Sequence, residues 1–281
     1  MQTVAVVLVC VACGGSGASS PDATSPAPQL VAEIDQLRSD QVVNRVQIGL
    51  TNGGDETVIV DSLRVRIPGF RSPGALAKDS PVAPGRPVNL PWPYGTVRCG
   101  SDAAPDVGRP VVTLRVHTES DPTARTLRLT GSDPTGVLQR IADRTCAVER
   151  INREVALDFA GQWRPEQGPD GVILHGTLRA RLRIDEPREV TEVRGAIMYG
   201  LSPDESAGPV PTPLALLTSN RRQAAIPVIA YAARCDGHTK GEIKKPYEFL
   251  VWVSSPGAEP VAVTPTVNQS TKDALRLACS F

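Results

Sequence analysis

The sequence predicts an all-β protein built from two tandem antiparallel β-sandwich modules, each with a short terminal helix and one disulfide. Two observations lead to this expectation. Short apolar stretches with period-two alternation recur along the chain and are separated by turn residues. A block of sequence also occurs twice, over 91–99 and over 227–235. Many strands with few strong helices between them are typical of a sandwich.

Both copies of the repeated block begin with a proline and end with an Arg-Cys pair, at Cys99 and Cys235. A further proline follows each cysteine at the same spacing, at Pro110 and Pro246, and an apolar run follows each proline. A period this long predicts duplicated domains and not a solenoid. We therefore divide the chain into a signal segment (1–13), a tether (14–29), a first module (30–150) and a second module (151–281).

The cysteines outside the N-terminal segment form two matched pairs. Even numbers of cysteines at repeating spacing predict disulfides in an exported chain. The repeat favours the pairs Cys99–Cys146 and Cys235–Cys279, since each module then closes on itself. Chain entropy alone would make each bridge worth roughly 3–4 kcal/mol. Four buried free thiols are the alternative.

The first module opens with an uncertain segment over 30–39, which we expect to be a short helix or an irregular lead-in. A clear strand follows, with Val46, Ile48 and Leu50 on one face. We expect two more strands at 57–60 and 63–67, and a loop over 70–85. Asp133 as N-cap predicts a helix that ends at Cys146.

The clearest strand of the second module carries three arginines on one face. Leu178, Ala180 and Leu182 alternate with Arg179, Arg181 and Arg183. Such a row presents guanidinium groups about 6.6 Å apart. It suits a polyanion such as a phosphate-bearing wall polymer, and a solvated sheet face is the alternative.

A second candidate binding site adjoins the disulfide of the second module. Arg234, Asp236 and His238 surround Cys235 in a polar loop. They could form a small binding site or a pair of metal ligands, whereas an Asx turn with an exposed imidazole is the structural alternative. A metal site needs three or four ligands, and His117 and His175 show no ligand spacing. We therefore expect no metal and no cofactor.

The charge balance and the motifs exclude several functions. Lys and Arg number 30, against 30 Asp and Glu, which argues against a general nucleic-acid binder. The sequence has no G-x-S-x-G, no H-E-x-x-H and no phosphate-binding loop. We therefore assign no catalytic residue and expect a protein that is not an enzyme.

The N-terminal segment resembles a bacterial lipobox. An apolar run from Val4 to Ala12 is too short to span a bilayer and is followed by Cys13-Gly14. The resemblance implies that Cys13 is the first mature residue and carries a lipid. The Gly-, Ser- and Pro-rich segment after it would be a disordered tether. An ordinary secretory signal with two incidental cysteines is the alternative.

Two further resemblances concern the folded part. The stretch from Val46 to Phe70 is similar to the opening hairpin of immunoglobulin-like domains, which implies that fold. The Arg-Cys-Asp-x-His segment with a terminal cysteine resembles a group of uncharacterised secreted actinobacterial lipoproteins with tandem immunoglobulin-like domains, and it implies no activity.

Together these observations predict an exported, lipid-anchored, non-enzymatic binding or scaffolding protein of the cell envelope. It would lie on the outer face of the cytoplasmic membrane, attached through its lipid, with an envelope protein or cell-wall glycan as partner. Two alternatives remain open. One is an envelope hydrolase that uses a carboxylate or His238 of the second module, and the other is an accessory protein of a transporter.

Overall fold

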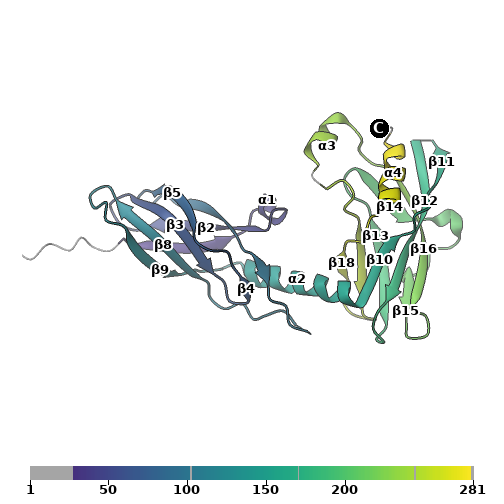
Figure 1. The fold of residues 1–281 in the computed structure, drawn as a ribbon, viewed down its shortest axis with the longest axis horizontal. Coiled ribbons are helices and arrows are strands. Elements are labelled where there is room, and N and C mark those ends of the chain that lie inside the picture. Colours follow the sequence, from purple (N-terminus) through teal and green to yellow (C-terminus); the bar gives the residue numbers. More distant parts are fainter. Residues whose placement is uncertain (1–27, 102, 170, 244, 280–281) are drawn as a thin grey trace, which may run out of the picture.

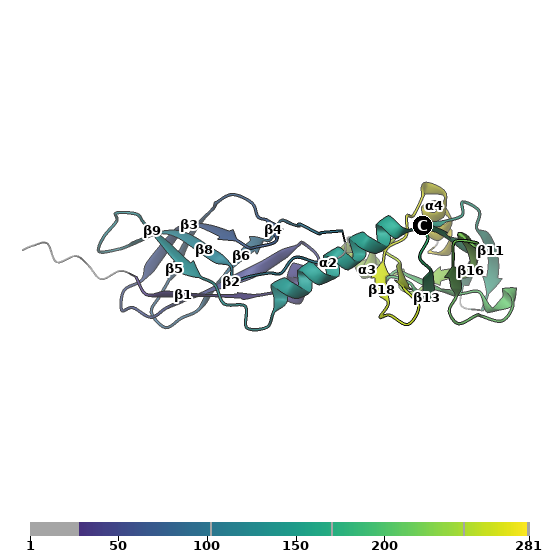
Figure 2. The same ribbon diagram turned by 90° about the horizontal axis from the view of Figure 1, so that it is seen from below.

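Two β-sandwich domains lie at opposite ends of one long helix, α2 (Val137–Glu154), as Figures 1 and 2 show from two directions. The structure is a computed structural model that describes residues 28–101, 103–169, 171–243 and 245–279. The predicted class, all-β with two tandem sandwiches, is confirmed. Cys13, the signal segment and most of the tether lie outside the described residues.

The first domain consists of two antiparallel sheets with the strand orders β1-β2-β6 and β5-β3-β8-β9. This order is that of an immunoglobulin-like sandwich, in which the chain crosses repeatedly between the two sheets. The short strands β4 and β7 form a separate pair. The strands are β1 (Leu30–Asp35), β2 (Arg45–Asn52), β3 (Val58–Arg66), β4 (Phe70–Arg71), β5 (Leu76–Val82), β6 (Val88–Pro93), β7 (Thr96–Val97), β8 (Val111–Thr118) and β9 (Arg125–Thr130).

The second domain repeats this arrangement with the strand orders β10-β12-β16-β14 and β15-β13-β17-β18, and it has two additional strands, β14 beside β16 and β11 beside β12. Its strands are β10 (Val155–Phe159), β11 (Arg164–Gly168), β12 (Gly171–Leu182), β13 (Arg188–Arg194), β14 (Tyr199–Pro203), β15 (Ala215–Leu217), β16 (Gln223–Ala232), β17 (Leu250–Ser254) and β18 (Val261–Val263). The shorter helices are α1 (Arg38–Gln41), η1 (Glu205–Ala207), α3 (Gly237–Glu242) and α4 (Gln269–Ala278).

The two copies of the repeated block occupy corresponding strands. Pro91 lies on β6 and Pro227 on β16, which pair with β2 and β12, the second strand of each first sheet. The predicted disulfides are also confirmed. Cys99–Cys146 spans 47 residues with a Cα–Cα distance of 5.3 Å, and Cys235–Cys279 spans 44 residues with a distance of 5.6 Å.

Helix α2 belongs to both domains. Near its start, Val137, Leu138 and Ala142 are buried in the core of the first domain, whereas Ile151 is buried in the core of the second. The helix has 18 residues, which corresponds to about 27 Å. Glu154 is its last residue and Val155 is already the first residue of β10. The domains are therefore joined by continuous secondary structure, and the boundary at 150/151 falls inside a helix.

The prediction for the two ends of this helix was wrong. Cys146 lies near its middle and does not end it, because the apolar positions continue to Ile151. The N-cap is Gly136 with φ 64°, so the helix begins later than expected. Asp133 still caps it from a distance, since its carboxylate accepts the N–H groups of Val137 (2.8 Å) and Leu138 (2.9 Å).

Three predictions for the first domain were also wrong. The segment 30–39 contains strand β1, whose buried Leu30, Ala32 and Ile34 alternate with exposed residues. The expected loop 70–85 contains β5, an edge strand that needs few apolar side chains and tolerates Pro81. Strands β2 and β3 form no hairpin, because they pair with different partners in opposite sheets.

In the part of the chain that the structure describes, no helix combines the length and the apolar character needed to cross a membrane.

Candidate functional site on the second domain

Strand β12 lies in the middle of the first sheet of the second domain and exposes one of its faces. It pairs with β10 and β11 on one side and with β16 on the other. Leu174, Leu178 and Leu182 point into the core. The alternate residues form what we call the outer face of β12: Ile173, His175, Thr177, Arg179 and Arg181.

The predicted arginine row is only partly available on this face. Arg179 is paired with Asp158, its direct neighbour on β10. Arg183 follows the end of β12 and donates a hydrogen bond to the carbonyl of Asn152 (3.1 Å). Arg181 is exposed. Neighbouring groups therefore engage two of the three guanidinium groups, and binding of a polyanion by the row stays a prediction.

The same face carries His175, for which the sequence indicated no ligand spacing and no other role. Its Nδ1 lies 2.7 Å from Oδ2 of Asp204, just after β14, and its Nε2 lies 3.1 Å from Oε2 of Glu166 on β11. The side chains of His175 and Asp204 are 13% and 9% exposed, whereas that of Glu166 is 57% exposed. The imidazole of His175 thus connects Glu166 on β11 with Asp204 at the end of β14.

The number of hydrogen-bond donors and acceptors on these side chains limits which contacts can form at the same time. A neutral imidazole has one N–H, so two carboxylates can both accept from His175 only when the ring is protonated. Asp204 is held in turn by Ser206, whose hydroxyl donates to its Oδ1 (2.5 Å). The hydrogen bonds from Ser206 and then from His175 lower the pKa of Asp204, which keeps this carboxylate charged.

The cluster does not have the geometry of a nucleophilic centre. A general-base histidine carries its nucleophile within hydrogen-bond reach of one ring nitrogen and its orienting group on the other. Here both ring nitrogens of His175 contact carboxylates, and the nearby hydroxyl of Ser206 donates its hydrogen bond to Asp204 and not to the imidazole. Among the described residues, no three or more His, Cys, Asp or Glu side chains are arranged so that they could hold a metal ion.

Arg234, Asp236 and His238 gather at the start of α3. Asp236 is the N-cap, and its carboxylate accepts from the N–H (2.9 Å) and the hydroxyl (2.8 Å) of Thr239. The hydrogen bonds from Thr239, with Arg234 at 3.5 Å, lower the pKa of Asp236 to about 2. His238 is the second residue of α3 and is exposed. Asp236 therefore has a structural role, and ligand binding at this segment stays a prediction.

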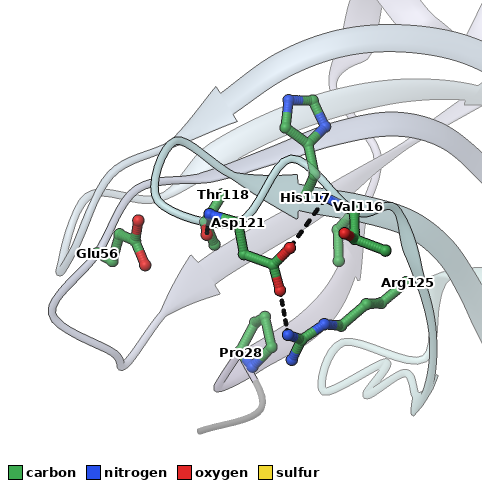
Figure 3. A pocket seen from close by; sticks show the side chains of 8 residues that line it. Pro28, Glu56, Val116, His117, Thr118, Asp121 and Arg125 are labelled. Carbon is green, nitrogen blue, oxygen red and sulfur yellow. Dashed lines mark hydrogen bonds and ion pairs between the residues drawn. The ribbon is translucent and has the colours of Figure 1, made fainter. Parts of the chain in front are cut away.

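A pocket of about 290 Å³, which includes space open to solvent, lies on the first domain beside Pro28 (Figure 3). Its polar groups hold the turn between β8 and β9. Asp121 is paired with Arg125, and Glu56 accepts the N–H of Ser120 (2.9 Å). The ring of His117 points away from Asp121 in Figure 3 and bonds to Asp61 (2.9 Å). The polar side chains that line this pocket therefore already have partners in the protein, and Asp121, Arg125 and Glu56 stabilise the turn between β8 and β9.

A second pocket lies against the first disulfide, between the loop at Gly100 and helix α2. It encloses about 380 Å³, including space open to solvent, and Arg150 and Arg153 line it together with Cys146. Arg153 donates to the carbonyl of Ser101 (3.3 Å). This arginine therefore helps to hold the loop against the helix, and neither of the two pockets includes His238.

Part of the His175 cluster could have been found from the sequence. The alternation that placed Arg179 and Arg181 on one face extends back to His175 on the same strand. Glu166 and Asp204 carried no such signal, since their proximity depends on the pairing of β11 and β14 within the sheet.

Comparison with known proteins gives no family. No family model and no curated protein matches the chain. Among solved structures, a YadV chaperone is 9% identical with a TM-score of 0.21, over 84% of this chain and 96% of its own. A protein of unknown function from Porphyromonas gingivalis W83 is 11% identical with a TM-score of 0.23, over 86% and 99%. The B domain of a biofilm associated protein is 8% identical with a TM-score of 0.21, over 84% and 83%. Scores this low carry no argument about function.

Proposed function

We propose that the protein is an exported, lipid-anchored, non-enzymatic binding or scaffolding protein of the bacterial cell envelope. It acts on the outer face of the cytoplasmic membrane, with its lipid on Cys13 and an envelope protein or cell-wall glycan as its partner. The observation that carries this proposal is helix α2, which is shared by the cores of both domains.

A shared helix suits a scaffold because it fixes the spacing between two surfaces. A flexible linker would let the domains move independently, whereas α2 passes into β10 with no intervening residue. Any partner held by one domain therefore keeps a defined distance from the other. The two disulfides fit an extracytoplasmic location, where such bonds form and persist.

The attachment is supported by the sequence around Cys13. Its test is a pair of variants expressed in the native host and followed by fractionation. Cys13→Ala should move the protein from the membrane fraction into the soluble fraction or the medium. Cys10→Ala, the matched control three positions earlier, should stay on the membrane. Retention of Cys13→Ala on the membrane would refute the lipid anchor.

The binding role is tested by crosslinking on intact cells, followed by identification of the attached material. We expect a discrete envelope protein or wall glycan. The competing hydrolase function makes a different prediction: purified protein would convert a wall-derived substrate, and the activity would disappear on mutation of one polar cluster. Such turnover would overturn the proposal.

A further inference from the structure

We infer that the outer face of β11, β12, β14 and β16 is a carbohydrate-binding site, with Tyr231 as the surface on which a sugar ring stacks. The inference rests on the proposed function for the location of the protein in the envelope and deepens it by naming a ligand class. It depends on three features of this face: a flat apolar floor, a polar rim and a balance of charges.

The floor is centred on Tyr231, which lies on β16 directly between Gly200 of β14 and Ile173 of β12. A Cβ atom added at Gly200 would lie 2.2 Å from Cζ of the Tyr231 ring. The ring therefore lies flat across the neighbouring strand, and only glycine leaves room for it there. Tyr231 is nevertheless 41% exposed. One face of the ring is fixed by the sheet, and the other is presented to solvent.

A second glycine extends the floor on the opposite side. A Cβ atom added at Gly168 would lie 2.8 Å from Cδ1 of Ile173, so Ile173 also lies flat, across β11. Ile229, two residues before Tyr231, completes the floor and is partly exposed. The three side chains lie on one face at neighbouring positions of β12 and β16, and Gly168 and Gly200 leave room for Ile173 and Tyr231 to lie flat. Such pre-organisation lowers the entropy lost when a ligand binds.

The polar rim is the His175 cluster. His175 is the direct neighbour of Ile229, and Glu166 is the direct neighbour of Ile173. Residues on adjacent strands lie about 5 Å apart, and alternate residues along a strand lie about 6.6 Å apart. The rim is therefore within the reach of one or two sugar rings stacked on Tyr231. Glu166 is mostly exposed, so its carboxylate can accept hydrogen bonds from the hydroxyl groups of a sugar while one of its oxygens contacts His175.

A carbohydrate fits this combination better than other ligands. A sugar ring has an apolar C–H face for the floor and hydroxyl groups at its edge for the rim. The face carries both acidic and basic side chains, since the carboxylates of Glu166 and Asp204 contact His175, whose direct neighbour on β11 is Arg164. A polyanion would meet two carboxylates here. A peptide adding to the sheet would use the backbone of an edge strand, which Tyr231 of the internal strand β16 does not offer.

The test is titration of the full-length purified protein with a soluble tetramer of N-acetylglucosamine, followed by calorimetry or NMR. The wild-type protein should bind, and Tyr231→Ala should lower the affinity about tenfold, as expected for the loss of a stacking surface. Tyr231→Phe keeps the ring and should bind as the wild type does. Val42→Ser, at a residue of the first domain that is 58% exposed, is the control for loss of an exposed apolar side chain and should also bind normally.

Equal binding by Tyr231→Ala and wild type would overturn the inference. So would failure of the wild-type protein to bind this tetramer and both β-1,4- and α-1,4-linked glucose tetramers. Binding of a phosphate-bearing polymer that requires Arg181 and not Tyr231 would refute it as well. The length of the tetramer after incubation separates this inference from the proposed function. Bound but shortened sugar would support the site and refute the non-enzymatic role, whereas a crosslinked protein partner without sugar binding would refute the site alone.

Discussion

The disulfide Cys99–Cys146 provides the sharpest test of how the first domain is held together. It connects the loop after β7 to the middle of α2, and its loop spans 47 residues. In the chain-entropy treatment, closing a loop of this length lowers the entropy of the unfolded chain enough to stabilise the fold by about 4 kcal/mol. For a domain of this size, 1 kcal/mol corresponds to about 4 °C in Tm, so the bond should raise Tm by about 15 °C.

The perturbation is the double variant Cys99→Ala with Cys146→Ala, compared with wild type by differential scanning calorimetry. We expect the transition of the first domain to fall by about 15 °C. The transition of the second domain should change little, because its core contacts α2 beyond Cys146, at Ile151. The matched control is Cys235→Ala with Cys279→Ala, whose loop of 44 residues predicts the same loss in the other domain.

Two results would refute this reasoning. A loss of less than about 1 kcal/mol would mean that packing around α2 constrains the loop without the bond. An equal fall in the Tm of both transitions would mean that the two domains unfold as one cooperative unit although each has its own core.

Two further predictions concern α2 and α3. Glu149→Pro removes a backbone hydrogen bond in the interior of α2 and should destabilise the helix by about 3 kcal/mol. The distribution of distances between spin labels on the two domains, measured by pulsed electron spin resonance, should therefore become broader. Glu149→Ala should leave them narrow, and an unchanged distribution for the proline variant would show that α2 does not set the spacing. Asp236 should titrate in an NMR experiment near pH 2, below its ordinary pKa of 3.8, because Thr239 donates to its charged form. Its capping of α3 is therefore complete above pH 3.8 and is lost as the pH falls towards 2. Thr239→Val removes one donor and should raise the midpoint, and a midpoint near 3.8 in both proteins would contradict the cap.

The features that sequence reasoning predicted are those fixed by local pattern or by repetition. Alternation over Leu178, Ala180 and Leu182 identified β12, since one buried face imposes a period of two on a strand. The disulfide pairs followed from the repeat alone. Both inferences compare positions along the chain and require no knowledge of which strands are neighbours.

The features that were missed depend on strand neighbours. Strand β5 lacks a strong pattern because it is an edge strand with polar residues, and its pairing with β3 comes from the sheet. Strands β2 and β3 read as a hairpin because a turn separates them, yet the turn leads from one sheet to the other. The cluster around His175 was missed for the same reason, since the partners of this residue come from β11 and from the end of β14.

The comparison of the two domains shows where the structure of the second domain departs from that of the first. In the repeated block, Tyr231 corresponds to Gly95. At Gly95, φ is 80° and the chain leaves the sheet, whereas at Tyr231 strand β16 continues, paired with β12 on one side and β14 on the other. Strand β12 is longer in the same direction, with 12 residues against 8 in β2, and the additional length pairs with β11. Tyr231, Ile173 and Glu166 therefore lie on a part of the sheet that has no counterpart in the first domain, whereas His175 and Ile229 correspond to Arg45 and Pro93. A feature shared by both domains is explained by the common fold, whereas the extension of the sheet around Tyr231 is specific to the second domain, and the carbohydrate-binding inference gives that extension a role.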